Sequence, residues 1–285
     1  MNTDLNGKIV LVTGGAGGIG SVISKSFAEQ GAKVIVHYNN SKDNAEKIAK
    51  EIGGDAIGAD LTDSTQSKEL FSNIIEKEGK IDVCIANAGN YPKGFAPLWE
   101  IESDRWENTV STNLSLTYNT ARDFLKHASE TKKGSLVLIG STAGIYGEAG
   151  HADYAAAKGA ITSGLLRTLK NDAAQIGNGV RVNAIAPGWP VSQKRLDEGL
   201  DQKRVERIVS TMSLKKLAKL LAENEKIEDL QNSIYSIAKE NQVRPKDFFK
   251  LLYQIILSTD RGPKIGPFIE DIGTKNVADA ISRYI

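Results

Sequence analysis

A glycine-rich turn between a short apolar strand and a helix constrains the fold of this chain most. Residues 8–12, Lys-Ile-Val-Leu-Val, indicate a buried strand, and residues 13–20, Thr-Gly-Gly-Ala-Gly-Gly-Ile-Gly, lead into a helix expected to end near residue 30. Residues 33–37 indicate the next strand. This order predicts an α/β unit in which glycines let the backbone approach a pyrophosphate at a helix N-terminus; an ordinary tight loop is the alternative. The predicted cofactor contacts in this turn are Gly14, Gly15, Gly17, Gly18, Ile19 and Gly20.

A serine, a tyrosine and a lysine form a candidate catalytic group farther along the chain. Ser141 follows the apolar run 136–139, which indicates a buried strand. Tyr154 and Lys158 lie in an Ala-rich segment that favours helix, and a spacing of four residues gives them one helix face. An ammonium group beside a phenol is expected to lower the phenol's pKa from about 10, which makes Tyr154 a usable general acid–base. Ser141 can hydrogen-bond the oxygen on which charge changes. A surface tyrosine with a solvated lysine is the alternative.

Ser141, Tyr154 and Lys158 have the spacing of the short-chain dehydrogenase/reductase family. The chain resembles this family over about residues 5–212, and it is similar to 3-oxoacyl-acyl-carrier-protein reductases and sugar dehydrogenases. The resemblance implies a Rossmann-type, doubly wound parallel α/β sheet. It also implies an NAD(P)-dependent oxidoreductase that interconverts a carbonyl and a secondary alcohol of a small-molecule or acyl-carrier substrate, such as a 3-oxoacyl thioester or a sugar. In that mechanism Tyr154 transfers the proton, Ser141 positions the oxygen, and Lys158 lowers the pKa of Tyr154 and holds the nicotinamide ribose.

The resemblance implies a fourth catalytic residue and further cofactor contacts. Asn113 lies in an expected helix over 105–127, and an asparagine there interrupts the family's helix and holds a water molecule through its backbone carbonyl. A polar residue on an exposed helix face is the alternative for Asn113. Pro190 has no N–H to donate to the carboxamide, so either Val191 makes that bond or it is absent. The other implied cofactor contacts are Asp60, Leu61, Asn87, Ala88, Gly89, Pro187, Gly188 and Ser192. For the segment that begins at Asp60, an Asp or Thr that caps the next helix is the alternative, and both can hold together.

The residues after the second strand predict the choice of cofactor. An acidic residue there would bind the ribose hydroxyls of NAD, but residues 37–41 read His-Tyr-Asn-Asn-Ser. His37 and Asn39 are therefore predicted to contact the cofactor without repelling a 2′-phosphate, and Lys42 is near enough to help. Gly17 argues the other way, because many NADP-dependent relatives have a basic residue at its position. We expect NADP to be preferred over NAD.

Composition excludes several other classes of function. A formal net charge of +1 argues against bulk attraction to nucleic acid or membranes. No run of about 18 apolar residues and no apolar N-terminal signal region occur, so we expect a cytoplasmic protein. The single cysteine, Cys84, lies in an apolar run and indicates a buried residue in a reducing compartment. The three histidines have no metal-ligand spacing, so no metal site is predicted.

The last part of the chain departs from the family pattern. We predict a Rossmann domain over 1–212 and a small all-α module over 213–285 that replaces the usual seventh strand. Apolar residues at helical spacing suggest three or four short helices, with Asp229 at one helix start and Pro245 in another first turn. Gly262-Pro263 and Gly266-Pro267 are expected to punctuate a loop.

The tail resembles the helical C-terminal region of class I lysyl-tRNA synthetases, which implies possible contact with RNA. The resemblance is carried by 231–235, 245–250, 252–253, 261–263 and 266–268. Residues 213–285 hold 12 Lys and Arg against 10 Asp and Glu, a margin too small to predict phosphate binding. We favour a helical cap over the sheet edge. The rival function for the whole chain is a catalytically impaired fusion scaffold that presents an RNA- or protein-binding module.

The family resemblance also implies an oligomeric state. Its tetramers pair the long helices that correspond here to about 105–127 and 154–175, and separately pair the final strand and the helix before it. The first pair of helices is present in this sequence, whereas the second set is replaced. We therefore expect a homodimer, with a tetramer as the alternative.

Overall fold

The computed structural model describes residues 3–188, 190, 202–224, 226–241 and 243–284, with the backbone alone for 202–212. The chain divides into two compact units, Met1–Gln193 and Lys194–Ile285, and each is described by itself. The boundary predicted between residues 212 and 213 lies inside helix α10 (Gln202–Glu223). Among the described residues, none of the helices has the length and apolar character that crossing a membrane requires.

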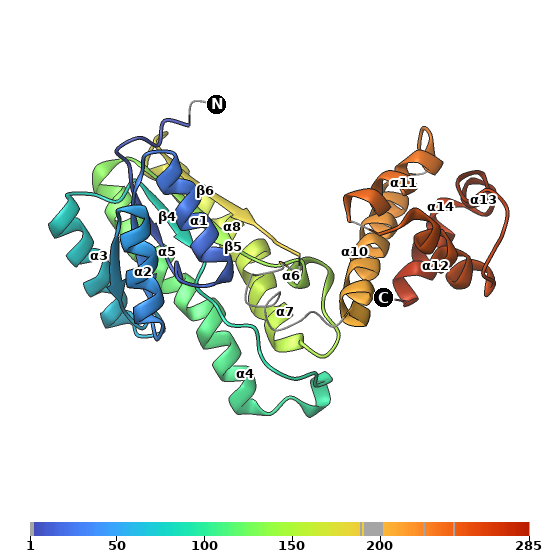
Figure 1. Cartoon of the computed structure of the whole chain (residues 1–285), viewed down its shortest axis with the longest axis horizontal. Helices are drawn as coiled ribbons and strands as arrows, with labels where there is room; N and C mark the ends of the chain where they lie inside the picture. The colour runs from blue at the N-terminus through green and yellow to red at the C-terminus, as the bar shows by residue number, and fades with distance from the viewer. Residues whose placement is uncertain (1–2, 189, 191–201, 225, 242, 285) are drawn as a thin grey trace. The chain divides into compact units, whose positions relative to one another are not determined.

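The first unit is built on a six-stranded parallel sheet in the order β3-β2-β1-β4-β5-β6 (Figure 1). The order reverses between β1 and β4, where sheets of this type bind ligands at the carboxyl ends of the strands. The predicted Rossmann-type fold is confirmed. In the part of the chain that is described, the sheet ends at β6 without a seventh strand. The strands are β1 (Ile9–Val12), β2 (Lys33–Tyr38), β3 (Asp55–Gly58), β4 (Val83–Ala86), β5 (Gly134–Ile139) and β6 (Val180–Ile185).

Helices pack on both faces of this sheet, which explains why its central strands are apolar on both sides. Neighbouring residues of β1 point to opposite faces: Leu11 joins a core with α3, α5 and α8, whereas Val10 and Val12 join a core with α1 and α2. The helices are α1 (Gly18–Glu29), α2 (Lys42–Ile52), α3 (Ser64–Glu78), α4 (Ser103–Val110), α5 (Leu116–Thr131), α6 (Ala143–Tyr146), α7 (Ala152–Gly159) and α8 (Leu166–Ile176).

Two long helical regions that the sequence indicates are each interrupted by a π-helical turn. The turn η2 (Ser111–Ser115) separates α4 from α5, and η3 (Ala160–Leu165) separates α7 from α8. Such turns insert an extra residue into the helical ladder and occur frequently at functional sites. The first contains Asn113, as the family resemblance implies, and the second follows Lys158 directly.

The second unit is all-α and has its own apolar core. Its described elements are α10, α11 (Leu230–Glu240), α12 (Pro245–Leu257), α13 (Ile265–Ile272) and α14 (Thr274–Tyr284). In the described residues after α10, these are four short helices, which agrees with the three or four that the apolar spacing suggests. Asp229 caps α11 and Pro245 opens α12, which confirms both predictions. The prediction that Gly266-Pro267 lies in a loop is wrong, because both residues fall in the first turn of α13. Proline is tolerated there because the first-turn N–H groups have no partner within the helix.

Candidate active site

The glycine turn at the end of β1 requires glycine at two positions. Gly14 has a positive φ of 61°, and a Cβ on it would lie 3.0 Å from the Cα of Ala88. A Cβ on Gly20 would collide with the carbonyl oxygen of Gly14. Gly17 precedes α1 without a side-chain cap among the described residues, so the first N–H groups of that helix face the turn unpaired. This arrangement suits the phosphate groups of a dinucleotide.

His37 at the end of β2 supports this turn from behind. Its Nδ1 accepts a hydrogen bond from the N–H of Gly14 at 3.1 Å, and its Nε2 lies 3.0 Å from the carbonyl oxygen of Ala59. The proton is therefore assigned to Nε2. Burial lowers the pKa of His37 to about 4, so the ring is neutral. Both ring nitrogens are taken by protein groups, which leaves neither for the direct cofactor contact that the sequence predicts.

The Asn-Ala-Gly segment after β4 ties the turn to the catalytic side chains. Asn87 donates through Nδ2 to the carbonyl oxygen of Thr13 at 2.9 Å and to that of Gly14 at 3.2 Å. A Cβ on Gly89 would lie 2.8 Å from Oδ1 of Asn113 and 3.3 Å from Nζ of Lys158. Only a glycine fits between these two side chains.

The loop after β3 is held by a residue that sequence reasoning missed. Asp60 accepts hydrogen bonds from the N–H and hydroxyl of Thr62 through Oδ1, at 2.9 and 2.7 Å. The carbonyl oxygen of the next residue, Leu61, accepts from Nδ2 of Asn119 at 2.9 Å. Asn119 belongs to α5, 58 residues farther along the chain, and no local pattern marks it. It fixes the segment where the adenine contacts are predicted.

The candidate catalytic residues converge at the carboxyl end of β5. Ser141 follows that strand, and its Oγ accepts from the N–H of Ala143 at 3.2 Å. Tyr154 and Lys158 lie on α7, and Nζ of Lys158 is 5.7 Å from the centre of the Tyr154 ring. The alternative of a surface tyrosine with a solvated lysine is wrong, because Lys158 is only 4% exposed.

The expected effect of Lys158 on Tyr154 is not what this geometry produces. Burial raises the pKa of Tyr154, the hydrogen bond with Ser141 lowers it, the charge of Glu148 raises it, and the net shift is upward. The ammonium of Lys158 donates instead to the carbonyl oxygen of Ile139 at 3.0 Å. Burial lowers the pKa of Lys158 to about 8, so its ammonium form is only weakly favoured at neutral pH.

Asn113 is fully buried in the π-helical turn η2, so the alternative of an exposed polar residue is wrong. Its Nδ2 donates to the carbonyl oxygen of Asn90 at 2.8 Å and to that of Thr109 at 3.0 Å. Its own carbonyl oxygen accepts from the hydroxyl of Thr117 at 2.7 Å. Asn113 therefore joins the helix interruption to the segment that follows Gly89.

The other predicted cofactor contacts lie around the same edge of the sheet. The carbonyl oxygen of Pro187 accepts from the N–H of Thr142 at 2.9 Å, which links the loop after β6 to the loop that carries Ser141. Asn39 is exposed just after β2. Ser192 and Val191 lie outside the described residues.

A partly buried ion pair at Asp153, the residue before Tyr154, was also missed by sequence reasoning. Arg105 of α4 donates through Nε to Oδ2 of Asp153 at 3.0 Å, and Thr109 donates to the same oxygen at 2.9 Å. Further bonds run from the guanidinium of Arg105 to the carbonyl oxygens of Gly94 and Gly150 at 3.2 Å. One arginine thus clamps the start of α7 and two neighbouring loops. Its partners are up to 48 residues away, so no sequence spacing could reveal it.

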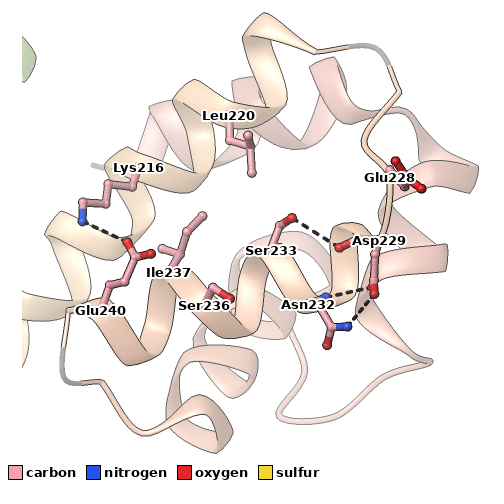
Figure 2. Close-up of a pocket in the computed structure, with 9 residues that line it drawn as sticks. All are labelled: Lys216, Leu220, Glu228, Asp229, Asn232, Ser233, Ser236, Ile237 and Glu240. Carbon is pink, nitrogen blue, oxygen red and sulfur yellow. Dashed lines mark hydrogen bonds and ion pairs between the residues drawn. The ribbon is translucent and has the colours of Figure 1, made fainter.

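Two hollows are lined by residues other than the candidate catalytic group, one in each unit. One of about 290 Å³ is lined by residues 40–44, at the start of α2. A larger one of about 540 Å³ lies between α10 and α11 in the second unit (Figure 2). Several of its polar side chains have partners: Lys216 pairs with Glu240 at 3.6 Å, and Asp229 caps α11. It is lined by Lys216, Leu220, Glu228, Asp229, Asn232, Ser233, Ser236, Ile237 and Glu240.

Comparison with known proteins agrees with this geometry. The pattern described as short chain dehydrogenase matches residues 8–201. The 3-oxoacyl-(acyl-carrier-protein) reductase of Thermotoga maritima is 33% identical over 220 residues, which cover 75% of this chain and 86% of the relative. A short-chain dehydrogenase/reductase of Pestalotiopsis microspora is 35% identical over 194 residues, covering 66% and 71%. The 3-oxoacyl-(acyl-carrier-protein) reductase of Salmonella typhimurium is 32% identical over 185 residues, covering 64% and 73%.

Proposed function

The chain belongs to the short-chain dehydrogenase/reductase family of enzymes, and from this premise we propose that it reduces the ketone of a 3-oxoacyl thioester to a secondary alcohol with NADPH. The observation that carries the proposal is the convergence of Asn113, Ser141, Tyr154 and Lys158 beside the glycine turn at the carboxyl edge of the sheet. The names of the relatives from Thermotoga maritima and Salmonella typhimurium support the substrate class. A sugar or a related small molecule is the alternative substrate.

The site fits a dinucleotide on its own geometry. Gly14 and Gly20 leave no room for a side chain where the pyrophosphate would approach, and α1 begins beside them with unpaired N–H groups in the described part of the chain. When bound, the nicotinamide supplies the hydride chemistry. Lys158 and Tyr154 would hold the ribose next to it, and Asp60 and Leu61 would flank the adenine.

Side chains of the protein would bind the carbonyl oxygen of the substrate and supply the proton that it takes up. Ser141 would donate a hydrogen bond to the substrate oxygen on which negative charge develops. The phenol of Tyr154 would give its proton to that oxygen, which requires a neutral phenol before transfer. Burial raises the pKa of Tyr154 and keeps the phenol protonated at neutral pH, as reduction needs. Lys158, whose pKa is lowered to about 8, could return a proton to the tyrosine.

The preference for NADPH is supported by the residues around the start of α2. Asn39, Asn40 and Ser41 are polar and uncharged, and they precede the exposed Lys42. Asn44 donates to the carbonyl oxygen of Ala16 at 2.7 Å, which brings the start of α2 against the glycine turn. We predict tighter binding of NADPH than of NADH by fluorescence titration. A dissociation constant tenfold lower for NADH would contradict the preference.

A screen of carbonyl substrates with both reduced cofactors tests the function most broadly. It should include 3-oxoacyl thioesters, sugars and simple ketones, with Tyr154→Phe as the inactive control. Consumption of NADPH with a 3-oxoacyl thioester is the expected result. If only sugars were turned over, a sugar would be the substrate instead of a 3-oxoacyl thioester. If no carbonyl compound were turned over, the proposed reductase function would be contradicted.

The second unit supports a further proposal for the tail. It has an apolar core of its own, and the family pattern ends at residue 201. We propose that it serves as a helical cap, while the synthetase-like resemblance makes an RNA-binding module the rival. A gel-shift assay with tRNA at low and moderate salt separates them, because a phosphate-binding module would show a salt-dependent shift.

A further inference from the structure

Tyr91 and His151 form an aromatic pair, and Tyr91 also contacts the candidate catalytic residue Tyr154. Tyr91, in the loop after β4, points its ring edge-on to Tyr154, with ring centres 5.0 Å apart and planes at 73°. The same ring stacks on His151 at 4.7 Å. Edge-on and stacked contacts of this kind add to the packing energy of aromatic rings. Tyr91 therefore contacts both His151, which precedes α7, and Tyr154 within that helix.

The hydroxyl of Tyr91 extends this contact to a charge. It donates to Oε1 of Glu148 at 2.7 Å. Glu148 is exposed in the loop between α6 and α7, so nothing in its own burial would fix its position. The hydrogen bond to Tyr91 holds the carboxylate on the side of Tyr154, and its negative charge is one of the causes that raise the pKa of Tyr154.

The two loops that carry this pair are bound together independently. The N–H of Ala96 donates to the carbonyl oxygen of Gly150 at 3.1 Å. Arg105 bonds the carbonyl oxygens of both Gly94 and Gly150. The distance between Tyr91 and Glu148 is therefore set by the backbone as well as by their own hydrogen bond.

We propose that Tyr91 and Glu148 form a positioning pair: the ring of Tyr91 holds the ring of Tyr154 in place, and its hydroxyl holds the carboxylate of Glu148 near that phenol. Neither residue belongs to the family's catalytic group as read from the sequence. The inference rests on the proposed role of Tyr154 as proton donor. The other groups that face or adjoin Tyr154 are Ser141, His151, Lys158 and the ion pair of Arg105 with Asp153.

The test is the titration of Tyr154 itself in the full-length chain. Every tyrosine of the chain is replaced by a fluorinated tyrosine. The phenol of this residue is more acidic, so it titrates within the pH range in which the chain stays folded. Fluorine NMR then follows each ring separately. The Tyr154 signal is assigned from its absence in Tyr154→Phe. Circular dichroism over the same pH range confirms that every variant remains folded.

Glu148→Gln should move the Tyr154 midpoint to lower pH, on the order of a few tenths of a pH unit for one partly screened charge nearby. Tyr91→Phe should move it in the same direction, because the carboxylate is no longer held beside the ring. The double variant should show no larger shift than Glu148→Gln alone, as expected for two residues that act through one contact. Added salt should shrink the difference between wild type and Glu148→Gln.

The matched control is Glu76→Gln, which removes an exposed carboxylate from α3. It should leave the Tyr154 midpoint unchanged. Equal midpoints in wild type and Glu148→Gln, or additive shifts in the double variant, would overturn the proposal. The titration does not require enzyme activity, so its outcome is independent of the substrate screen. If the chain turned over no carbonyl, the proposed function would be contradicted, but the Tyr154 midpoints could still be compared.

Discussion

The imidazole of His37 shows how one buried side chain can hold a glycine turn in place. It accepts from the N–H of Gly14 and donates to the carbonyl oxygen of Ala59, so it joins the glycine turn to the end of β3. This requires a neutral ring with one specific tautomer. Protonation would turn the acceptor nitrogen into a donor facing an N–H group, and the contact would be lost.

The stability of the chain should therefore fall in acid because of His37. Its folded-state pKa of about 4 lies below the value of about 6.5 for an exposed histidine, so the unfolded chain takes up the proton first. The contribution is complete above about pH 6.5 and is lost progressively toward about pH 4, on the order of 3 kcal/mol in total. Urea unfolding of wild type and His37→Gln at several pH values measures it. Identical pH dependence in the two proteins would contradict this role.

Most elements of the first unit could be predicted, because most of its strands carry a short apolar run. Strand β6 differs, since Arg181 and Asn183 alternate with its apolar residues. The spacing of Tyr154 and Lys158 also predicted their common helix face, since α7 contains both. The direction of Lys158 was not predictable, because its bond to Ile139 depends on how α7 packs against β5. Local sequence could not reveal Asn119 or Arg105 either, since their partners lie far away along the chain.

The clamp between α4 and α7 allows a prediction at this scale. Burial opposes ionisation of Asp153, but the hydrogen bonds from Arg105 and Thr109 hold its pKa below the usual range. Arg105→Ala leaves a buried carboxylate without its ion-pair partner and should cost about 3 kcal/mol of unfolding free energy. Arg105→Lys keeps the charge but loses the forked geometry, so it should be intermediate.

Chemical denaturation of the two variants measures these costs. Arg105→Ala combined with Asp153→Asn is the control, because removal of the charge should recover part of the loss. A loss in Arg105→Ala no larger than that of an ordinary surface substitution, about 0.5 kcal/mol, would show that the clamp contributes little.

Exposed side chains and an exposed sheet edge bear on the oligomeric state of the protein. Trp106 on α4 and Tyr118 on α5 are exposed, on the helices expected to pair in a dimer. In the described part of the first unit, β6 is an edge strand, and one side of it has no neighbouring strand to pair with its backbone groups. Exposed edges of this kind favour aggregation. We predict a homodimer through the long helices, with the second unit protecting the sheet edge.

Light scattering on the full chain and on a chain that ends at Gln193, the last residue of the first unit, tests this assembly. The full chain should be dimeric, and the shortened chain should be less soluble or less stable. A monomeric full chain would contradict the long-helix interface. A shortened chain as soluble and stable as the whole would contradict the capping role of the tail.

The substitution Tyr154→Phe tests most directly whether Tyr154 transfers the proton in carbonyl reduction. The substitution removes the phenol oxygen and keeps the ring that packs against Tyr91. The turnover of the best substrate found in the screen is measured beside NADPH binding by fluorescence. Turnover should fall by about 100-fold or more, while the dissociation constant of NADPH changes little. Near wild-type turnover in Tyr154→Phe would contradict the account.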